Sequence, residues 1–185
     1  MAKIKVIEHE EATGRLKEIY GELVKSRGKL ADVHKIQSLR PESIVKHMDL
    51  YMELMFTKSE LSRAEREMIA VVVSATNKCE YCQIHHAHAL NHYWKNEEKI
   101  TALRKSYTFD DISAREEALI YYAKKLTASP GDCVEDCPKY LQEVGLTDSG
   151  ILDATIVIAY FNFVNRIVLS LGVEVEDDDG GGYAY

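Results

Sequence analysis

The sequence contains few residues that interrupt helices. Only three of its 185 residues are proline, and three of its ten glycines form one run at residues 180–182. Long helices therefore suit this chain better than many short strands. Hydrophobic residues make up 46% of the chain and charged residues 29%, an ordinary globular composition that excludes wholesale disorder.

Three kinds of segment are also missing. The longest apolar runs, residues 68–73 and 155–160, fall far short of the ~20 residues that a transmembrane helix needs. The first residues, MAKIKVIEHEE, lack the apolar stretch of a signal peptide. No basic stripe is present to neutralise phosphates. We therefore expect a soluble, cytoplasmic protein that binds neither membranes nor nucleic acid.

The negative charge is concentrated near one end. The net charge of −7 arises from 23 basic and 30 acidic residues, and five of the acidic ones are Glu174 and residues 176–179. Without these five, the chain is nearly neutral. Acidic residues followed by a glycine run predict a solvated tail over residues 173–185, after a single domain over residues 1–172.

Apolar spacing and helix-start signals predict helices along most of the chain. Ser62 with Glu65, and Ser113 with Glu116, match the capping box in which each side chain binds a backbone N–H at the helix start. The second box follows the first by 51 residues, which suggests two related helical units. The expected fold class is all-α, with helices over about residues 10–26, 41–55, 62–77, 79–94, 96–104, 113–129, 132–145 and 151–171.

The main group of chemically reactive residues is Glu67, Cys79, Cys82 and His86. The two cysteines are three residues apart, so their sulfurs lie on one side of a helix, close enough for a disulfide. His86 follows one turn later and can take the thiol proton of Cys82, leaving the reactive thiolate. If the helices over 62–77 and 79–94 form an antiparallel hairpin, Glu67 faces His86. The predicted arrangement is a proton relay, Glu67–His86–Cys82, with Cys79 ready to close a disulfide.

Two other interpretations of these residues remain open. Glu67 can instead be exposed near the start of its helix, where the helix dipole favours a negative charge. Alternatively, Cys79, Cys82 and His86 can ligate zinc, with Glu67 or a distant cysteine as the fourth ligand, in a metal-binding or structural module.

The remaining cysteines and nearby histidines carry less information. Cys133 and Cys137 are expected to be packing residues, with a second redox pair as the alternative. We assign no role to His85, His88 or His92.

The pattern Glu-x11-Cys-x2-Cys-x3-His resembles the active-site motif of the alkylhydroperoxidase D-like family in the carboxymuconolactone decarboxylase superfamily. The flanking segments 61–67 (LSRAERE) and 160–166 (YFNFVNR) resemble the peroxidase-related branch of that family. The motif core covers residues 61–94, and looser similarity extends over 113–172. This resemblance implies an all-helical fold of about seven or eight helices and a homo-oligomer.

The resemblance also implies an enzyme that reduces small hydroperoxides with thiols. Cys82 would be the peroxidatic thiol and Cys79 the resolving one, while Glu67 and His86 would move protons. No bound cofactor is implied; an external dithiol, of lipoyl type in this family, would be the reductant. The chain departs from the family at Tyr81, where the best-described members have histidine, and a phenol is a much weaker base. A decarboxylase-like lactone enzyme is the other chemistry of the superfamily, but that branch does not rely on the cysteine pair.

Overall fold

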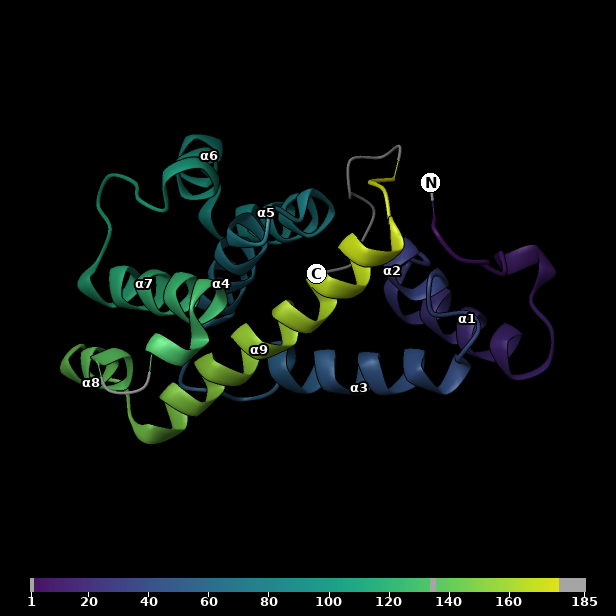
Figure 1. Cartoon of the computed structure of the whole chain (residues 1–185), viewed down its shortest axis with the longest axis horizontal. Coiled ribbons are helices and arrows are strands. Elements are labelled where there is room, and N and C mark those ends of the chain that lie inside the picture. The colour runs from purple at the N-terminus through teal and green to yellow at the C-terminus, as the bar shows by residue number, and fades with distance from the viewer. Residues whose placement is uncertain (1, 134–135, 177–185) are drawn as a thin grey trace.

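The computed structural model of this protein describes residues 2–133 and 136–176, and within them all regular structure is helical (Figure 1). The prediction of an all-α fold is confirmed. Two 3₁₀ helices, η1 (His9–Glu11) and η2 (Pro130–Asp132), accompany the α-helices. The α-helices are α1 (Gly14–Arg27), α2 (Asp32–Lys35), α3 (Pro41–Phe56), α4 (Arg63–Thr76), α5 (Glu80–Trp94), α6 (Glu97–Ser106), α7 (Ala114–Ala128), α8 (Asp136–Glu143) and α9 (Asp148–Leu171).

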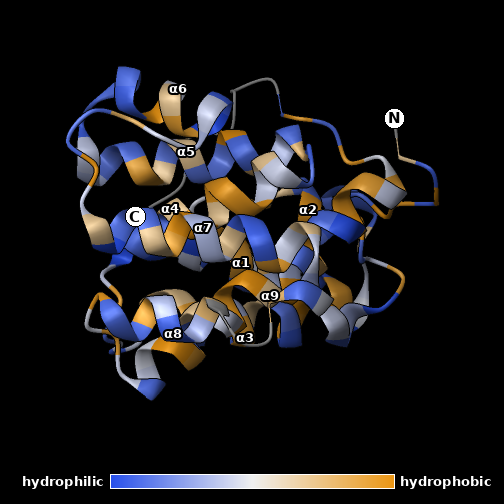
Figure 2. Ribbon diagram, turned by 60° about the vertical axis from the view of Figure 1, so that its left-hand side comes forward, coloured by the Kyte–Doolittle hydropathy of each residue, from blue (hydrophilic) through white to orange (hydrophobic). Residues whose placement is uncertain are grey.

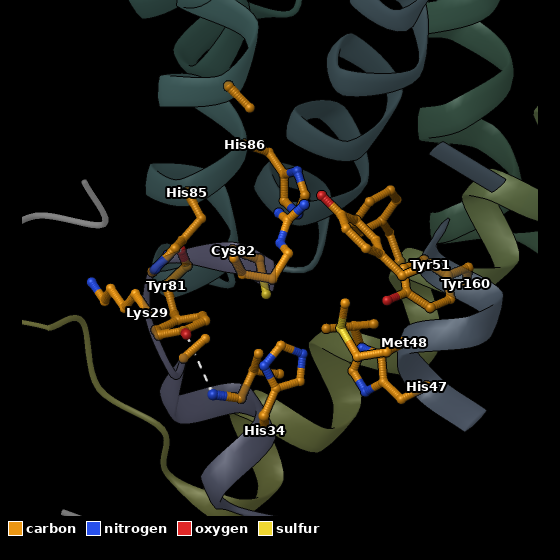
Figure 3. A pocket seen from close by; sticks show the side chains of 16 residues that line it. Lys29, His34, His47, Met48, Tyr51, Tyr81, Cys82, His85, His86 and Tyr160 are labelled. Atoms are coloured by element: carbon orange, nitrogen blue, oxygen red, sulfur yellow. Dashed lines mark hydrogen bonds between the residues drawn. The ribbon is translucent and has the colours of Figure 1, made fainter. Parts of the chain in front are cut away.

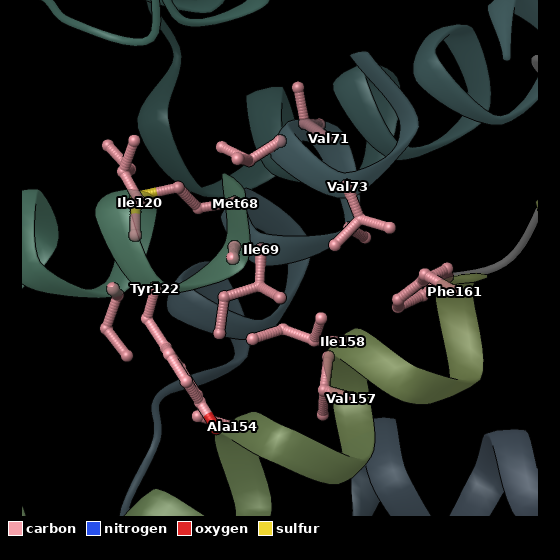
Figure 4. Close-up of a cluster of buried hydrophobic side chains, with 14 of the residues drawn as sticks. Met68, Ile69, Val71, Val73, Ile120, Tyr122, Ala154, Val157, Ile158 and Phe161 are labelled. Atoms are coloured by element: carbon pink, nitrogen blue, oxygen red, sulfur yellow. The ribbon is translucent and has the colours of Figure 1, made fainter. Parts of the chain in front are cut away.

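Helix α4 is the centre of the molecule. It contacts α5, α7 and α9, and every residue from Met68 to Val73 is fully buried. A helix that is apolar on all sides must be enclosed by other helices. Figure 4 shows Met68 and Ile69 of α4 meeting side chains of α7 and α9, among them Tyr122 and Ile158. Figure 2 shows the hydrophobic segments of α9 and its neighbours between hydrophilic outer turns.

Both predicted capping boxes are present. Ser62 and Ser113 each accept a hydrogen bond from the backbone N–H three residues later, and Glu65 and Glu116 return the bond. The starts of α4 and α7 are also joined to each other, because Arg115 Nε donates to Glu65 Oε1 at 2.6 Å. The descent of these helices from two related units stays a prediction.

A tight turn joins α4 to α5 and places the cysteine pair. Lys78 adopts a left-handed backbone conformation with a φ of 58°, and the Cys79 N–H donates to the Ser74 carbonyl at 2.8 Å. The side chain of Asn77 ties this turn to α9 by donating to Asn162 and Asn165, each at 3.0 Å. The predicted antiparallel hairpin is therefore confirmed, and Cys79 is the N-cap residue of α5.

Helix α9 crosses the other helices and positions the far side of the site. By length and composition alone it is apolar enough to span a membrane, which the short apolar runs of the sequence did not indicate. Nine of its residues are buried, however, and it contacts α3, α4 and α7. This is also the pattern of a core helix in a soluble protein.

Some helix boundaries were predicted wrongly. The first helix begins at Gly14, because residues 9–11 form a 3₁₀ helix. The helix expected from 132 begins at Asp136, because Pro130–Asp132 form a 3₁₀ helix instead. The four-residue helix α2 was missed because it is too short to show a period.

The expectation that Cys133 and Cys137 are only packing residues is wrong. Both are buried, but their sulfurs are bonded in a disulfide, with the two Cα atoms 5.5 Å apart. This separation is ordinary for a disulfide. The bond links the segment after η2 to α8.

The caps predict a stability effect. We expect Ser62→Ala and Ser113→Ala each to lower the free energy of unfolding by about 1 kcal/mol, because each leaves a backbone N–H without its partner. Ser170→Ala is the matched control, since its hydroxyl binds only carbonyl groups of its own helix. Urea unfolding measures all three. Equal losses for caps and control would contradict this account of the helix starts.

Candidate active site

The site is built around the carboxylate of Glu67, which is fully buried on α4. Its Oε1 accepts hydrogen bonds from Arg63 Nε at 2.9 Å and from a second guanidinium nitrogen at 2.5 Å. Its Oε2 contacts His86 Nδ1 at 2.6 Å. Burial alone would raise the pKa of Glu67, but the charges and hydrogen bonds of His86 and Arg63 hold this pKa below its ordinary value. Glu67 faces His86 as predicted, and the exposed alternative is wrong.

Arg63 anchors this carboxylate to α3 as well. The arginine lies one turn before Glu67 on α4, the spacing at which helix side chains meet. It also donates to the Met55 carbonyl at 3.2 Å, and its guanidinium lies 3.8 Å from the centre of the Phe56 ring. The buried carboxylate therefore contacts groups of α4 and α5 directly and is linked to α3 through Arg63.

The contact with Glu67 also orients His86. A carboxylate accepts hydrogen bonds, so the Nδ1 of His86 carries the proton and Nε2 of the neutral ring is left as a base. The ring packs edge-on against Phe161, with centroids 4.5 Å apart. His86 and Cys82 line the same pocket, and Figure 3 shows them close together on it. Among the contacts of the described residues, none joins the His86 ring to the Cys82 sulfur directly.

The two cysteines are free thiols in sulfur contact. Their Sγ atoms are 3.0 Å apart; Cys79 is fully buried and Cys82 is 3% exposed. Cys82 lines the pocket, whereas Cys79 lies behind it. The sulfur contact lowers the pKa of Cys79 and, together with burial, raises that of Cys82 well above its ordinary value. The charge of the singly ionised pair thus favours Cys79, while the accessible sulfur is Cys82.

Asn165 of α9 is a site residue to which the sequence analysis gave no role. It is fully buried; its Oδ1 accepts from Asn77 and its Nδ2 donates to Ser74 Oγ at 3.2 Å. It also forms a hydrogen bond with the Cys82 side chain that works against the rise in that pKa. The signal available in the sequence was a polar residue within an apolar helix.

A pocket of about 90 Å³ opens onto Cys82. Burial lowers the pKa of His34 to about 3, helped by the neighbouring His47 and Arg27, and it lowers that of His47 to about 4. Burial raises the pKa of Tyr51 and Tyr160. These side chains are therefore neutral near pH 7. The other lining residues are Arg27, Lys29, Ala31, Val33, Met48, Tyr81, His85, His86, Ala89, Phe161 and Val164.

Comparison with known proteins supports the family resemblance of the sequence. The sequence profile of the carboxymuconolactone decarboxylase family matches residues 44–125. The uncharacterized protein YdfG of Bacillus subtilis (strain 168) is 26% identical over 134 residues, which are 72% of this chain and 90% of that protein.

Among the solved structures that resemble nearly the whole chain are two peroxidase-related proteins. One is an uncharacterized peroxidase-related protein from Ralstonia eutropha JMP134, described as an alkylhydroperoxidase AhpD core. Its TM-score is 0.86 at 26% identity, and the match covers 97% of this chain and 94% of that protein's chain. A peroxidase-related protein from Silicibacter sp. TM1040 has a TM-score of 0.84 at 27% identity and covers 98% of both chains. The chain therefore matches the carboxymuconolactone decarboxylase family over residues 44–125, and its fold is that of alkylhydroperoxidase D-like, peroxidase-related proteins. These similarities support a peroxidase-related or decarboxylase-like role.

Tyr81 is where this chain departs from better-described members of the alkylhydroperoxidase D-like family. Its hydroxyl donates to Glu176 Oε1 at 3.0 Å and accepts from the Val33 N–H at 3.3 Å. Glu176 also accepts from the Asp32 N–H at 3.1 Å, and its other oxygen lies 2.9 Å from His85 Nε2. The phenol at this position therefore holds α2, α5 and the segment after α9 together.

This arrangement corrects two predictions. Glu176 was expected in a solvated tail, but its side chain is only 12% exposed and packs against the body of the protein; residues 177–185 lie outside the described residues. His85, to which no role was assigned, lines the pocket. Sequence spacing gave no signal for either, because their contact joins residues 91 apart in the chain.

The ligand set of the zinc alternative is not assembled as a metal site. Within residues 2–133 and 136–176, no group of three or more histidine, cysteine, aspartate or glutamate side chains is placed to hold a metal ion. Glu67 is occupied by Arg63 and His86 instead.

The Glu176 contacts predict a pH effect on stability. Burial would raise the pKa of Glu176, but His85 and the Asp32 N–H lower it from 4.5 to about 2. A depressed pKa stabilises the fold above pH 4.5 and loses this contribution as the pH falls toward about 2. We therefore expect the native protein to have a higher free energy of unfolding than Glu176→Gln. This difference should be constant just above pH 4.5 and should shrink below it.

Urea unfolding between pH 3 and 6 measures this advantage, with the exposed Glu143→Gln as the matched control. An advantage over Glu176→Gln that grows as the pH falls would contradict the assigned contacts.

Proposed function

We propose that the protein is a thiol-dependent peroxidase that reduces small hydroperoxides with Cys82 as the nucleophile. The observation that carries this proposal is the arrangement of the sulfurs: Cys82 lines the pocket and Cys79 lies 3.0 Å behind it. Next to them, the His86 imidazole is held by a buried carboxylate. A base that is fixed by a third group is the usual way to activate a nucleophile.

The first step is attack of the Cys82 thiolate on the terminal peroxide oxygen. The S–O bond forms as the O–O bond breaks; Cys82 becomes a sulfenic acid and the hydroperoxide leaves as an alkoxide. The thiol proton passes to His86 Nε2, and the imidazolium then returns a proton to the alkoxide, giving the alcohol. Glu67 stabilises the imidazolium while it exists.

The second step forms a disulfide between Cys82 and Cys79. The sulfur of Cys79 attacks the sulfenic acid of Cys82, and the products are a disulfide and water. The sulfurs need to approach by only about 1 Å to reach a disulfide bond length. An external dithiol, of the lipoyl type, then reduces this disulfide and is itself oxidised. The protein needs no bound cofactor for this cycle.

Once one proton has left, the two sulfurs share the remaining one. Because the charge of the singly ionised pair favours Cys79, the shared proton must move from Cys82 to Cys79 before Cys82 attacks. The hydrogen bond of Asn165 to Cys82 favours that transfer. In this proposal, Asn165 stabilises the thiolate of Cys82, and His86 receives the proton that the thiol pair releases.

We also propose that the protein is a cytoplasmic homo-oligomer. Large hydrophobic side chains are exposed on two helices that cross, α3 and α9, and a second copy would cover them. These side chains are Leu50, Met52, Phe56, Leu152, Phe163 and Leu169.

Cysteine variants test the catalytic assignment. With a hydroperoxide and a supplied dithiol, Cys82→Ser is expected to lower the turnover rate by at least about 100-fold, because no other thiol of the described residues lines the pocket. Cys79→Ser is expected to consume about one equivalent of peroxide and then stop, because the sulfenic acid is not resolved. The double variant Cys133→Ser/Cys137→Ser is the control and keeps its turnover. Unchanged turnover in Cys82→Ser would refute the proposal.

A further inference from the structure

The lining of the pocket is positively charged, although the whole protein carries a net charge of −7. Arg27 and Lys29 line the pocket, and within residues 2–133 and 136–176 no aspartate or glutamate does. The two nearby carboxylates are engaged elsewhere, Glu67 with Arg63 and His86, and Glu176 with His85 and Tyr81. Positive charge in a partly desolvated cleft attracts anions.

Arg27 is placed to receive such an anion. It is the last residue of α1, and its guanidinium lies 5.5 Å from the centre of the Tyr51 ring. Its charge reaches the interior of the pocket, where it lowers the pKa of His34 and opposes the rise in that of Tyr160. Arg15 and Arg63 each have a carboxylate partner, whereas no ion pair involves Arg27 in the described part of the chain.

The rest of the pocket is suited to a small apolar ring. Met48, Tyr160, Phe161 and Val164 contribute apolar or aromatic surface, and the space of about 90 Å³ is small. Figure 3 shows Met48 and Tyr160 grouped on one side and Cys82 farther across the pocket. Aromatic side chains bind flat apolar ligands through offset-stacked or edge-to-face contacts.

We propose that this pocket binds small aromatic carboxylates, with the carboxylate on Arg27 and the ring beside Met48 and Tyr160. A guanidinium and a carboxylate form paired, charge-assisted hydrogen bonds. The preferred substrate is then an aromatic hydroperoxide that also bears a carboxylate, with its peroxide group toward Cys82. The substrate assignment rests on the proposed peroxidase function, whereas the binding of the carboxylate does not.

Calorimetric titration with benzoate tests the binding independently of catalysis. Benzoate is expected to bind to the intact protein, and Arg27→Gln is expected to weaken this binding at least about tenfold, the usual effect of losing a charged hydrogen bond. Arg27→Lys keeps the charge and retains much of the affinity. Arg15→Gln, an exposed arginine on the same helix, is the matched control. Neutral benzamide should bind equally to the native protein and Arg27→Gln.

A kinetic comparison then tests the substrate class. Cumene hydroperoxide and its para-carboxylate derivative differ only in charge, and kcat/KM should favour the carboxylate in the native protein and lose that preference in Arg27→Gln. Benzoate binding that is absent, or unchanged in Arg27→Gln, would overturn the inference. Arg27-dependent benzoate binding without any peroxide turnover would refute the peroxidase function and leave the anion site intact.

Discussion

The structure depends on one buried charge. Glu67 lies in the most enclosed helix of the protein, with no exposed surface, and a carboxylate there is tolerated only with partners that satisfy it. Arg63 and His86 are those partners. Because Arg63 also binds the Met55 carbonyl on α3, and His86 belongs to α5, satisfying this one carboxylate fixes three helices relative to each other.

The same constraint explains the chemistry of the site. A hydrogen bond to Glu67 keeps the proton on His86 Nδ1 and leaves Nε2 as a base. The turn after α4 then sets the thiols at the start of α5, and Asn77 ties that turn to Asn165 beside Cys82. One set of buried polar contacts thus holds the base, and a second set holds the turn that carries the thiols.

Local sequence signals accounted for the scaffold and for the centre of the site. The capping boxes at Ser62 and Ser113 consist of hydrogen bonds between residues three positions apart, so both helix starts could be predicted from the sequence. The Glu67–His86 contact followed from helix rise and a hairpin turn, which are also regular. The close fold similarity to peroxidase-related proteins agrees with the resemblance carried by the motif.

What sequence reasoning missed depends on contacts between distant segments. Arg27 and Glu176 reach the site from opposite ends of the chain, and neither lies in a periodic pattern that points there. The Cys133–Cys137 disulfide was missed because its spacing suits packing as well as bonding. The role of Tyr81 could not be predicted either, because it depends on Glu176, 95 residues later in the chain. The phenol forms a structural hydrogen bond with that carboxylate and does not serve as a weakened base.

The central claim is that the buried Glu67 carboxylate, acting through His86, makes Cys82 reactive. The most direct measurement is the rate of Cys82 alkylation by iodoacetamide at pH 7, followed by peptide mass spectrometry. The exposed Glu117→Gln is the matched control, and circular dichroism verifies that each variant is folded. We expect Glu67→Gln to slow the alkylation of Cys82 by about tenfold or more, because the imidazole loses the charge that stabilises its protonated form. Alkylation of Cys82 in Glu67→Gln at the native rate would contradict the account.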